Sequence, residues 1–275
     1  MKMIIRSVDD EVLERVVHDF GFLSDRIDKE NGELDLRLRN NYFNLYYKGN
    51  SLAKVRVKTT PYPIEINKAF AMGAIDCSRF GQPKMSGDYC VYEVLPADLP
   101  AFLSKTVITR LYSKIKACDF SEELVFEQLL IADNRDRSDF VIIDRQVQGG
   151  ALGRDRIDLL ALRKTDAGSR FQFVVVEVKM GNNPELSGAV ADQIQGYVKT
   201  ITENFDEFKS CYERTYFQMK AIGLLKAVTF DSIQIETPVK GVIVVGGYPG
   251  LARKAESCLR REHPDLSIRS IDYKI

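Results

Sequence analysis

The sequence predicts an α/β protein in which a small α+β module is followed by a larger region of helices and strands. Alternating apolar and polar residues, the pattern of half-buried strands, recur in the N-terminal part. Apolar residues at helical spacing begin near Leu103, and short runs rich in β-branched residues follow between helical segments. We therefore expect an N-terminal module over residues 1–105 and a second domain over residues 106–275.

Composition bounds the classes of protein to consider. The 275 residues include 39 basic and 39 acidic side chains, and 45% of them are hydrophobic, which is enough for a packed core. No apolar stretch approaches the ~20 residues of a membrane span, and the first residues lack a signal-peptide core. We expect a cytoplasmic protein without a membrane segment. Five scattered cysteines and two histidines argue against a zinc site, a disulfide framework or a histidine-activated nucleophile.

The N-terminal module is expected to combine one helix with antiparallel strands. Acidic residues after Ser7 and apolar residues at helical spacing predict a helix that stops at Gly21. Leucines alternate with charged residues over residues 34–39, which predicts a half-buried strand. Residues 48–50 suit a hairpin turn. Further strands are expected at residues 43–47, 52–57, 64–66 and 90–95.

Aromatic and cationic side chains occur together in this module. Such a surface could stack bases and hold phosphates, or it could belong to an ordinary sheet with one solvated face. The role of the module stays open; if the chain is an enzyme, the module would choose the substrate or the partner. The residues concerned are Tyr42, Phe43, Tyr46, Tyr47, Lys48, Lys54, Arg56 and Lys58.

The second domain is expected to begin with two helices. In the second of these, Glu122 and Glu123 lie in the first turn, and Phe126, Leu129 and Leu130 form the apolar stripe. From this second helix onward, the expected order is helix, strand, strand, strand and helix. The expected strands are residues 140–143, 156–162, 173–179, 239–247 and 266–271, and the later helices are residues 184–201, 206–226 and 251–262.

Charged residues at the ends of two apolar strands are the candidate site. Glu177 and Lys179 share one face of their strand because alternate side chains point the same way. Asp158 lies in another apolar strand, where a buried acid needs a cation or a hydrogen-bond donor. Two carboxylates on adjacent strands can hold Mg²⁺, which prefers oxygen ligands. Lys179 beside that ion could orient or deprotonate an attacking water, or neutralise charge on a phosphate.

Each of these residues also has an ordinary interpretation. A Glu-x-Lys tripeptide often marks a strand that reaches the surface, since short motifs match by accident. Asp158 could pair with Arg154 or Arg156 rather than with a metal. These two arginines could hold phosphates or simply form a solvated loop end.

Together the pieces resemble the PD-(D/E)xK nuclease superfamily over roughly residues 115–205. The resemblance implies a restriction-endonuclease-like mixed central sheet flanked by helices, in α-β-β-β-α-β order. It also implies metal binding by Asp158, Glu177 and the Val178 backbone carbonyl, with Lys179 as a catalytic residue. The matching pieces are Arg156-Ile157-Asp158-Leu159-Leu160, Val175-Val176-Glu177-Val178-Lys179 and Gln193-Ile194-Gln195-Gly196-Tyr197, the last similar to the Gln-x-x-x-Tyr element of RecB-like members.

Further site residues follow from the resemblance. Members often carry another catalytic and metal-binding Glu on the preceding helix, for which Glu123 is our choice and Glu127 the alternative. Gln193 and Tyr197 lie on one helical face and would contact nucleic acid, although Tyr197 could equally be a core aromatic. The sequence departs from the pattern at Ile157, which stands where the motif has proline.

The function expected from this resemblance is hydrolysis of phosphodiester bonds in DNA, in restriction, repair or defence. Mg²⁺ would be the cofactor, with Mn²⁺ as a substitute. The alternative is a catalytically silent nuclease-fold protein that binds nucleic acid or another protein. A homodimer would suit double-strand cutting, but no residue indicates one.

Overall fold

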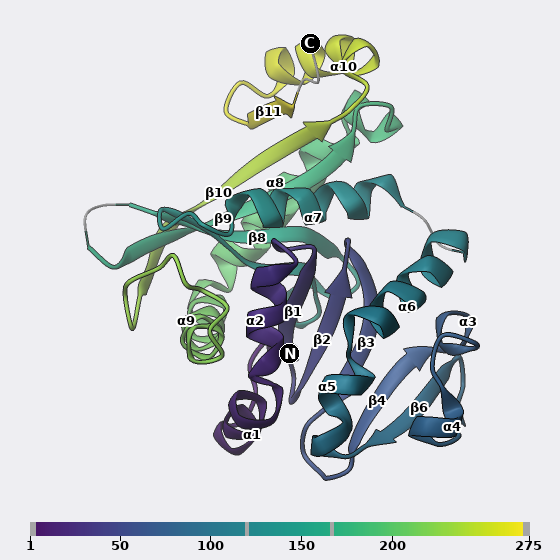
Figure 1. Ribbon diagram of the computed structural model, residues 1–275. Helices are drawn as coiled ribbons and strands as arrows, with labels where there is room; N and C mark the ends of the chain where they lie inside the picture. The colour runs from purple at the N-terminus through teal and green to yellow at the C-terminus, as the bar shows by residue number, and fades with distance from the viewer. Residues whose placement is uncertain (1–3, 119–120, 166–167, 272–275) are drawn as a thin grey trace. The chain divides into compact units, whose positions relative to one another are not determined.

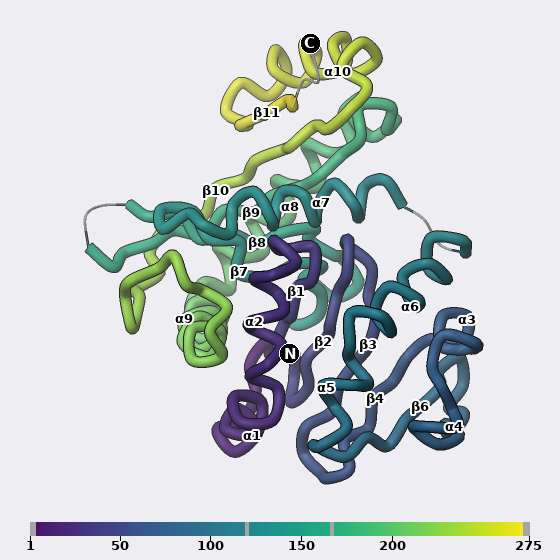
Figure 2. Tube along the Cα trace, in the orientation of Figure 1, coloured from purple at the N-terminus to yellow at the C-terminus, as the bar shows by residue number. Residues whose placement is uncertain are grey.

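The computed structural model describes residues 4–118, 121–165 and 168–271, which form two compact units (Figure 1). The N-terminal unit contains the described residues of Arg6–Ala132 and Gln218–Lys226. The C-terminal unit contains residues 4–5 and the described residues of Asp133–Phe217 and 227–271. The chain changes unit four times: after Ile5, within α7 (Glu122–Asn134), within α9 (Phe205–Ala221) and after Lys226. Figure 2 shows the course of the chain. The domain division at residues 105 and 106 stays a prediction.

A six-stranded antiparallel sheet forms the centre of the N-terminal unit, in the order β1-β2-β3-β4-β6-β5. Its strands are β1 (Leu34–Arg39), β2 (Tyr42–Tyr47), β3 (Asn50–Arg56), β4 (Tyr62–Asn67), β5 (Lys84–Ser86) and β6 (Tyr89–Val94). Its helices are α1 (Asp10–Phe20), α2 (Phe22–Lys29), α3 (Lys68–Ala71), α4 (Cys77–Phe80), η1 (Pro96–Asp98), α5 (Leu99–Phe102), α6 (Lys105–Cys118) and the first part of α7 (Glu122–Asn134). The antiparallel module expected from the sequence is confirmed.

The hairpin between β2 and β3 has the predicted turn. Tyr47 pairs with Asn50, so Lys48 and Gly49 form a two-residue loop, with φ angles of 48° and 86°. Positive φ at both central residues matches the twist of the flanking strands. Gly49 also lies against the start of α7, because a Cβ atom there would come 1.9 Å from the Leu124 carbonyl oxygen.

The charged residues of β1 correct the prediction of a half-buried strand. All six residues of β1 are buried, including Asp35, Arg37 and Arg39. Buried charges need hydrogen-bond partners, and the strand supplies them. The Arg37 Nε donates to the Asp35 Oδ2 at 2.8 Å, and the Arg39 Nη1 donates to the Leu38 carbonyl at 2.8 Å.

Burial also decides between the two interpretations of the aromatic residues in this module. Phe43, Tyr46 and Tyr47 are buried, so their rings cannot stack on the bases of a ligand. Tyr42 is only half-buried, and the Lys54 Nζ lies 4.6 Å from its ring centroid. The structure therefore favours an ordinary sheet over a base-stacking surface.

Gly21 ends α1 as predicted, but the chain does not leave the helical region there. Its φ and ψ angles are −53° and −31°, and α2 follows at once. The second helix was not predicted. The first helix begins after Asp9 rather than directly after Ser7, without a side-chain cap.

The C-terminal unit is built on a mixed five-stranded sheet in the order β11-β10-β9-β8-β7. Strand β8 runs antiparallel to its neighbours β7 and β9, whereas β9, β10 and β11 run parallel. The strands are β7 (Phe140–Gln148), β8 (Arg156–Lys164), β9 (Arg170–Met180), β10 (Gln234–Gly246) and β11 (Ser267–Ile271). The helices are η2 (Gly150–Leu152), η3 (Pro184–Ser187), α8 (Ala189–Glu203), the first part of α9 (Phe205–Ala221) and α10 (Pro249–Glu262).

Two helices cover the face of this sheet that carries Phe173. The Phe173 ring makes edge contacts with aromatic rings of α9, at centroid distances of 5.8 to 6.5 Å. Helix α8 packs on β10 at Gly241, where a Cβ atom would come 3.0 Å from the Ile194 side chain. Glycine thus lets α8 approach the sheet closely, and this contact fixes the helix that carries Gln193 and Tyr197.

Helix α7 has a different buried face from the one predicted. Leu129 is 49% exposed, whereas Glu127 and Gln128 are buried beside Phe126 and Ile131. The Gln128 Nε2 donates to the Gly32 carbonyl at 2.5 Å, so a polar contact holds this face.

The remaining expected elements are present with shifted ends. β7 runs five residues further than expected, to Gln148, and β10 begins five residues earlier, at Gln234. The expected helix at residues 184–201 is divided by Gly188 into η3 and α8, and α9 ends at Ala221. Among the described residues, none of the helices has the length and apolar character needed to cross a membrane.

Candidate active site

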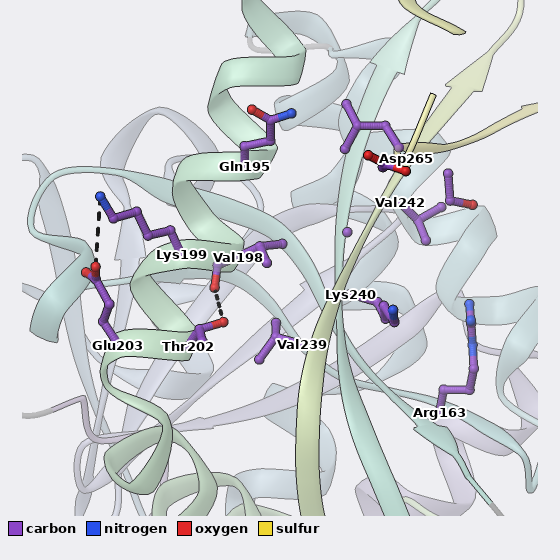
Figure 3. A pocket seen from close by; sticks show the side chains of 13 residues that line it. Arg163, Gln195, Val198, Lys199, Thr202, Glu203, Val239, Lys240, Val242 and Asp265 are labelled. Atoms are coloured by element: carbon purple, nitrogen blue, oxygen red, sulfur yellow. Dashed lines mark hydrogen bonds and ion pairs between the residues drawn. The ribbon is translucent and has the colours of Figure 1, made fainter. Parts of the chain in front are cut away.

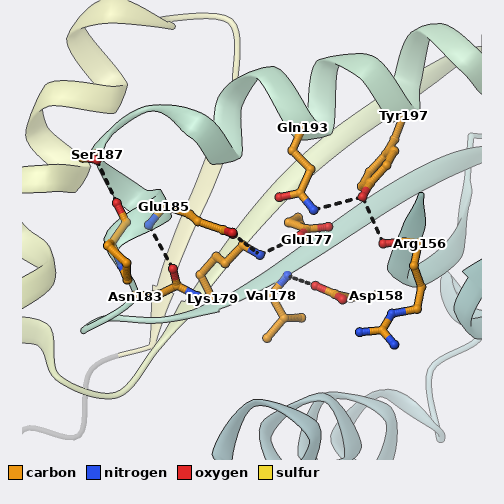
Figure 4. Close-up of polar contacts among 11 residues, drawn as sticks. Arg156, Asp158, Glu177, Val178, Lys179, Asn183, Glu185, Ser187, Gln193 and Tyr197 are labelled. Atoms are coloured by element: carbon orange, nitrogen blue, oxygen red, sulfur yellow. Dashed lines mark hydrogen bonds and ion pairs between the residues drawn. The ribbon is translucent and has the colours of Figure 1, made fainter. Parts of the chain in front are cut away.

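The register of β8 and β9 brings the two strand carboxylates together. Leu159 pairs with Val176 in this antiparallel pair, so the next position along places Asp158 opposite Glu177. Directly opposite residues project their side chains from the same face of a sheet. Asp158 and Glu177 are both buried, and Figure 4 shows them beside Val178 and Lys179.

Asp158 is held by the backbone of the neighbouring strand. The Val178 N–H donates to the Asp158 Oδ2 at 2.9 Å. Since the N–H and carbonyl of one residue in a strand point to the same side, the Val178 carbonyl also faces β8. Burial raises the pKa of Asp158, although the Val178 N–H, Lys179 and Arg156 act in the opposite direction. A further positive charge near Asp158 would therefore stabilise its carboxylate form.

Lys179 lies between two carboxylates. Its Nζ is 2.9 Å from the Glu177 Oε1 and 2.8 Å from the Glu185 Oε2 (Figure 4). Burial by itself would lower the pKa of Lys179, but the charge of Glu177 and the hydrogen bonds to both carboxylates raise it above its usual value. Lys179 is consequently a protonated cation. Of the roles considered for it, neutralising charge on a phosphate fits this state, and deprotonating water does not.

Glu185 is a site residue that sequence reasoning missed. It lies in η3, where the Asn183 side chain accepts a hydrogen bond from the Glu185 N–H at 2.9 Å. The sequence correctly indicated Asn183 as a cap and Pro184 as the first residue of a helical turn. An acid in such a turn is ordinary, so no sequence signal distinguished Glu185 from other first-turn acids.

The Gln-x-x-x-Tyr residues form a hydrogen-bonded chain that ends on β8. The Gln193 Nε2 donates to the Tyr197 hydroxyl at 2.9 Å, and this hydroxyl donates to the Arg156 carbonyl at 3.0 Å (Figure 4). Tyr197 is buried. The contact ties α8 to the first residue of β8, two residues from Asp158. The side chains of Arg154 and Arg156 are exposed and available to a ligand.

Replacing Tyr197 with phenylalanine is expected to reduce the free energy of unfolding by about 1 kcal/mol, the net value of a buried hydrogen bond. Tyr216→Phe is the matched control, because the Tyr216 hydroxyl donates to the Phe230 carbonyl at 2.7 Å in the same unit. Urea denaturation of both variants measures the loss. A Tyr197→Phe variant as stable as the wild type would show that this hydrogen bond contributes nothing to the fold.

The helix carboxylate stays a prediction. Glu123 is half-buried on α7, whereas the alternative, Glu127, is buried. Both belong to the N-terminal unit, whereas Asp158, Glu177 and Lys179 belong to the C-terminal unit. Within residues 4–118, 121–165 and 168–271, no three His, Cys, Asp or Glu side chains gather in a metal-binding arrangement.

A cavity of about 540 Å³ lies elsewhere in the C-terminal unit (Figure 3). It is lined by residues of β8, α8 and β10 and by the segment that leads into β11 with its first residue. Asp158, Glu177 and Lys179 do not line it. Its charged lining residues are Arg163, Lys199, Glu203, Lys240 and Asp265.

Comparison with protein families, with curated proteins and with solved structures found no match to this chain. Its function therefore has to be inferred from the side chains themselves. Two buried carboxylates and a backbone carbonyl that faces β8 are oxygen donors of the kind that Mg²⁺ binds. The raised pKa of Asp158, caused by burial, fits a site that gains from a bound cation.

Proposed function

We propose that this protein is a divalent-metal-dependent nuclease that cleaves DNA, with a restriction-endonuclease-like fold around β7, β8, β9, α8 and β10. The observation that supports the proposal most directly is the convergence of Asp158 and Glu177 on one face of adjacent strands, with Lys179 in contact with Glu177. The element order α7-β7-β8-β9-α8-α9-β10 is compatible with the α-β-β-β-α-β core.

Asp158, Glu177 and the Val178 carbonyl would hold Mg²⁺. When bound, the ion polarises the phosphate and makes a water nucleophile available near neutral pH. Both carboxylates are fixed before any ligand arrives, since they are buried and Asp158 is hydrogen-bonded to β9. Such preorganisation lowers the cost of assembling the site.

Lys179 would act as a fixed positive charge. Its ammonium group is held by the strand carboxylate and stays protonated, so it can stabilise negative charge that develops on the phosphate. Two exposed arginines would contact backbone phosphates and position the nucleic acid. Arg156 is the first residue of β8, and Arg154 lies two residues before it. Gln193 and Tyr197 would keep this strand start in place.

A catalytically silent nucleic-acid-binding or protein-binding module is the second candidate. The observation in its favour is the ion pair between Lys179 and Glu177 at 2.9 Å, since Lys179 already supplies a positive charge to the carboxylates. Such a protein would keep the fold and bind its partner without hydrolysis. Nuclease assays distinguish the two candidates.

The test is incubation with single- and double-stranded DNA and RNA, with Mg²⁺, with Mn²⁺ and with EDTA. We expect metal-dependent cleavage of DNA by the wild-type protein. Asp158→Asn should lose cleavage and weaken Mn²⁺ binding, measured by calorimetry, by about tenfold or more because a charged ligand is removed. Binding of nucleic acid without cleavage under all conditions would favour the silent module, and unchanged Mn²⁺ binding by Asp158→Asn would exclude the proposed metal site.

A further inference from the structure

The two carboxylates that contact Lys179 differ in their access to solvent. The Glu177 side chain is 1% exposed and the Lys179 side chain 7% exposed, whereas the Glu185 side chain is 49% exposed. Glu177 therefore lies on the inner side of the ammonium group and Glu185 on its solvent side. A ligand that approaches Lys179 from solvent meets the Glu185 carboxylate first.

The backbone that carries Glu185 is anchored at several points. The Asn183 side chain caps the turn, and Leu186 is buried. Upstream, the Gly181 N–H donates to the Gly246 carbonyl at 2.9 Å, and a Cβ atom at Gly181 would come 2.4 Å from the Gly247 carbonyl oxygen. The turn is thus fixed on the β10–α10 connection, and release of Lys179 requires only rotation of the Glu185 side chain.

That rotation is easy in physical terms. Exposed side chains change rotamer within nanoseconds, and ion pairs with an exposed partner contribute little to stability. Glu177, in contrast, is buried and cannot withdraw from Lys179 without a larger rearrangement. Only one of the two carboxylates can therefore exchange with an incoming anion.

We infer that the solvent side of Lys179 is a phosphodiester-binding position, which the Glu185 carboxylate occupies in the free protein and leaves when nucleic acid binds. This inference rests on the proposed nuclease function, and it adds a residue that weakens substrate binding. Glu185 carries the same charge as a phosphate oxygen, so it repels the substrate as well as competing with it for the ammonium group.

Glu185→Gln tests the inference, since glutamine keeps the size of the side chain and removes its charge. Binding of a fluorescent DNA oligonucleotide is measured in EDTA by anisotropy, so that metal binding and cleavage play no part. We expect roughly two- to fivefold tighter binding, the effect of one partly exposed charge interaction. In steady-state cleavage with Mg²⁺, KM should fall by a similar factor while kcat stays the same.

Glu203→Gln is the matched control. It removes one negative charge from the same unit, in an exposed pair with Lys199 at 3.9 Å, and should leave DNA binding unchanged. In a Lys179→Gln background, Glu185→Gln should strengthen binding less, because competition for the ammonium group is gone and only the repulsion between like charges is removed. Double-mutant analysis thus separates an effect through Lys179 from a general change in charge.

The outcomes distinguish this inference from the proposed function. Equal or weaker DNA binding by Glu185→Gln, or a lower kcat at unchanged KM, would overturn the competing role and leave the nuclease assignment standing. A gain of the same size in the Lys179→Gln background would also overturn it. A wild-type protein that neither binds nor cleaves nucleic acid would overturn both.

Discussion

Lys179→Ala is expected to lower kcat for metal-dependent DNA cleavage by about 10²–10³-fold, the usual effect of removing one preorganised electrostatic group. Lys179 is the protonated group in contact with the Glu177 carboxylate, and it is buried enough for its charge to act strongly on a bound phosphate. Alanine also leaves the buried Glu177 carboxylate without this cation, and an unpaired buried charge destabilises the folded protein. Lys179→Gln, which keeps a hydrogen-bond donor, is the second variant, and thermal unfolding of both checks that they fold.

Metal binding separates a catalytic role of Lys179 from a structural one. The ammonium group repels a cation bound by Asp158 and Glu177, so its removal should leave Mn²⁺ binding equal or tighter. Lys199→Ala, which removes an exposed lysine of α8, is the control and should cleave like the wild type. Unchanged cleavage by a folded Lys179→Gln variant would rule out the proposed chemistry.

The arrangement of the strand residues could be predicted because it follows from local geometry. Glu177 and Lys179 share a face through the two-residue period of a strand. Their apposition to Asp158 depends in addition on the register between β8 and β9, in which Leu159 pairs with Val176. The sequence predicted two carboxylates on adjacent strands, but it did not specify that register.

Glu185 could not be predicted because its position depends on contacts distant in the sequence. The turn between β9 and η3 is fixed by the hydrogen bond from Gly181 to Gly246, more than sixty residues later in the chain. The burial of β1 was missed for a related reason. Alternation of leucine with charged residues normally indicates one solvated face, but Arg37 and Asp35 pair with each other and remain buried.

Gly49→Ala is expected to destabilise the N-terminal unit by about 3 kcal/mol or more, through two effects that add. A non-glycine residue at φ 86° pays the cost of the left-handed region, about 1–2 kcal/mol. The new Cβ would also come 1.9 Å from the Leu124 carbonyl oxygen and 2.5 Å from its carbonyl carbon. Both atoms belong to backbone, so the first turn of α7 or the hairpin itself has to move. Urea denaturation, followed by circular dichroism, measures the loss.

Comparison with Gly87→Ala isolates the second effect, the steric contact with Leu124. Gly87 also has positive φ, at 57°, and lies in the turn between β5 and β6, but a Cβ atom there has no atom within 4 Å. It should therefore lose only the conformational part, about 1–2 kcal/mol. The difference between the two variants reports the contact between the β2–β3 hairpin and α7. If the two variants lost the same free energy of unfolding, the contact between the hairpin and α7 would contribute nothing to stability. Helix α7 would then not be held against the hairpin in solution.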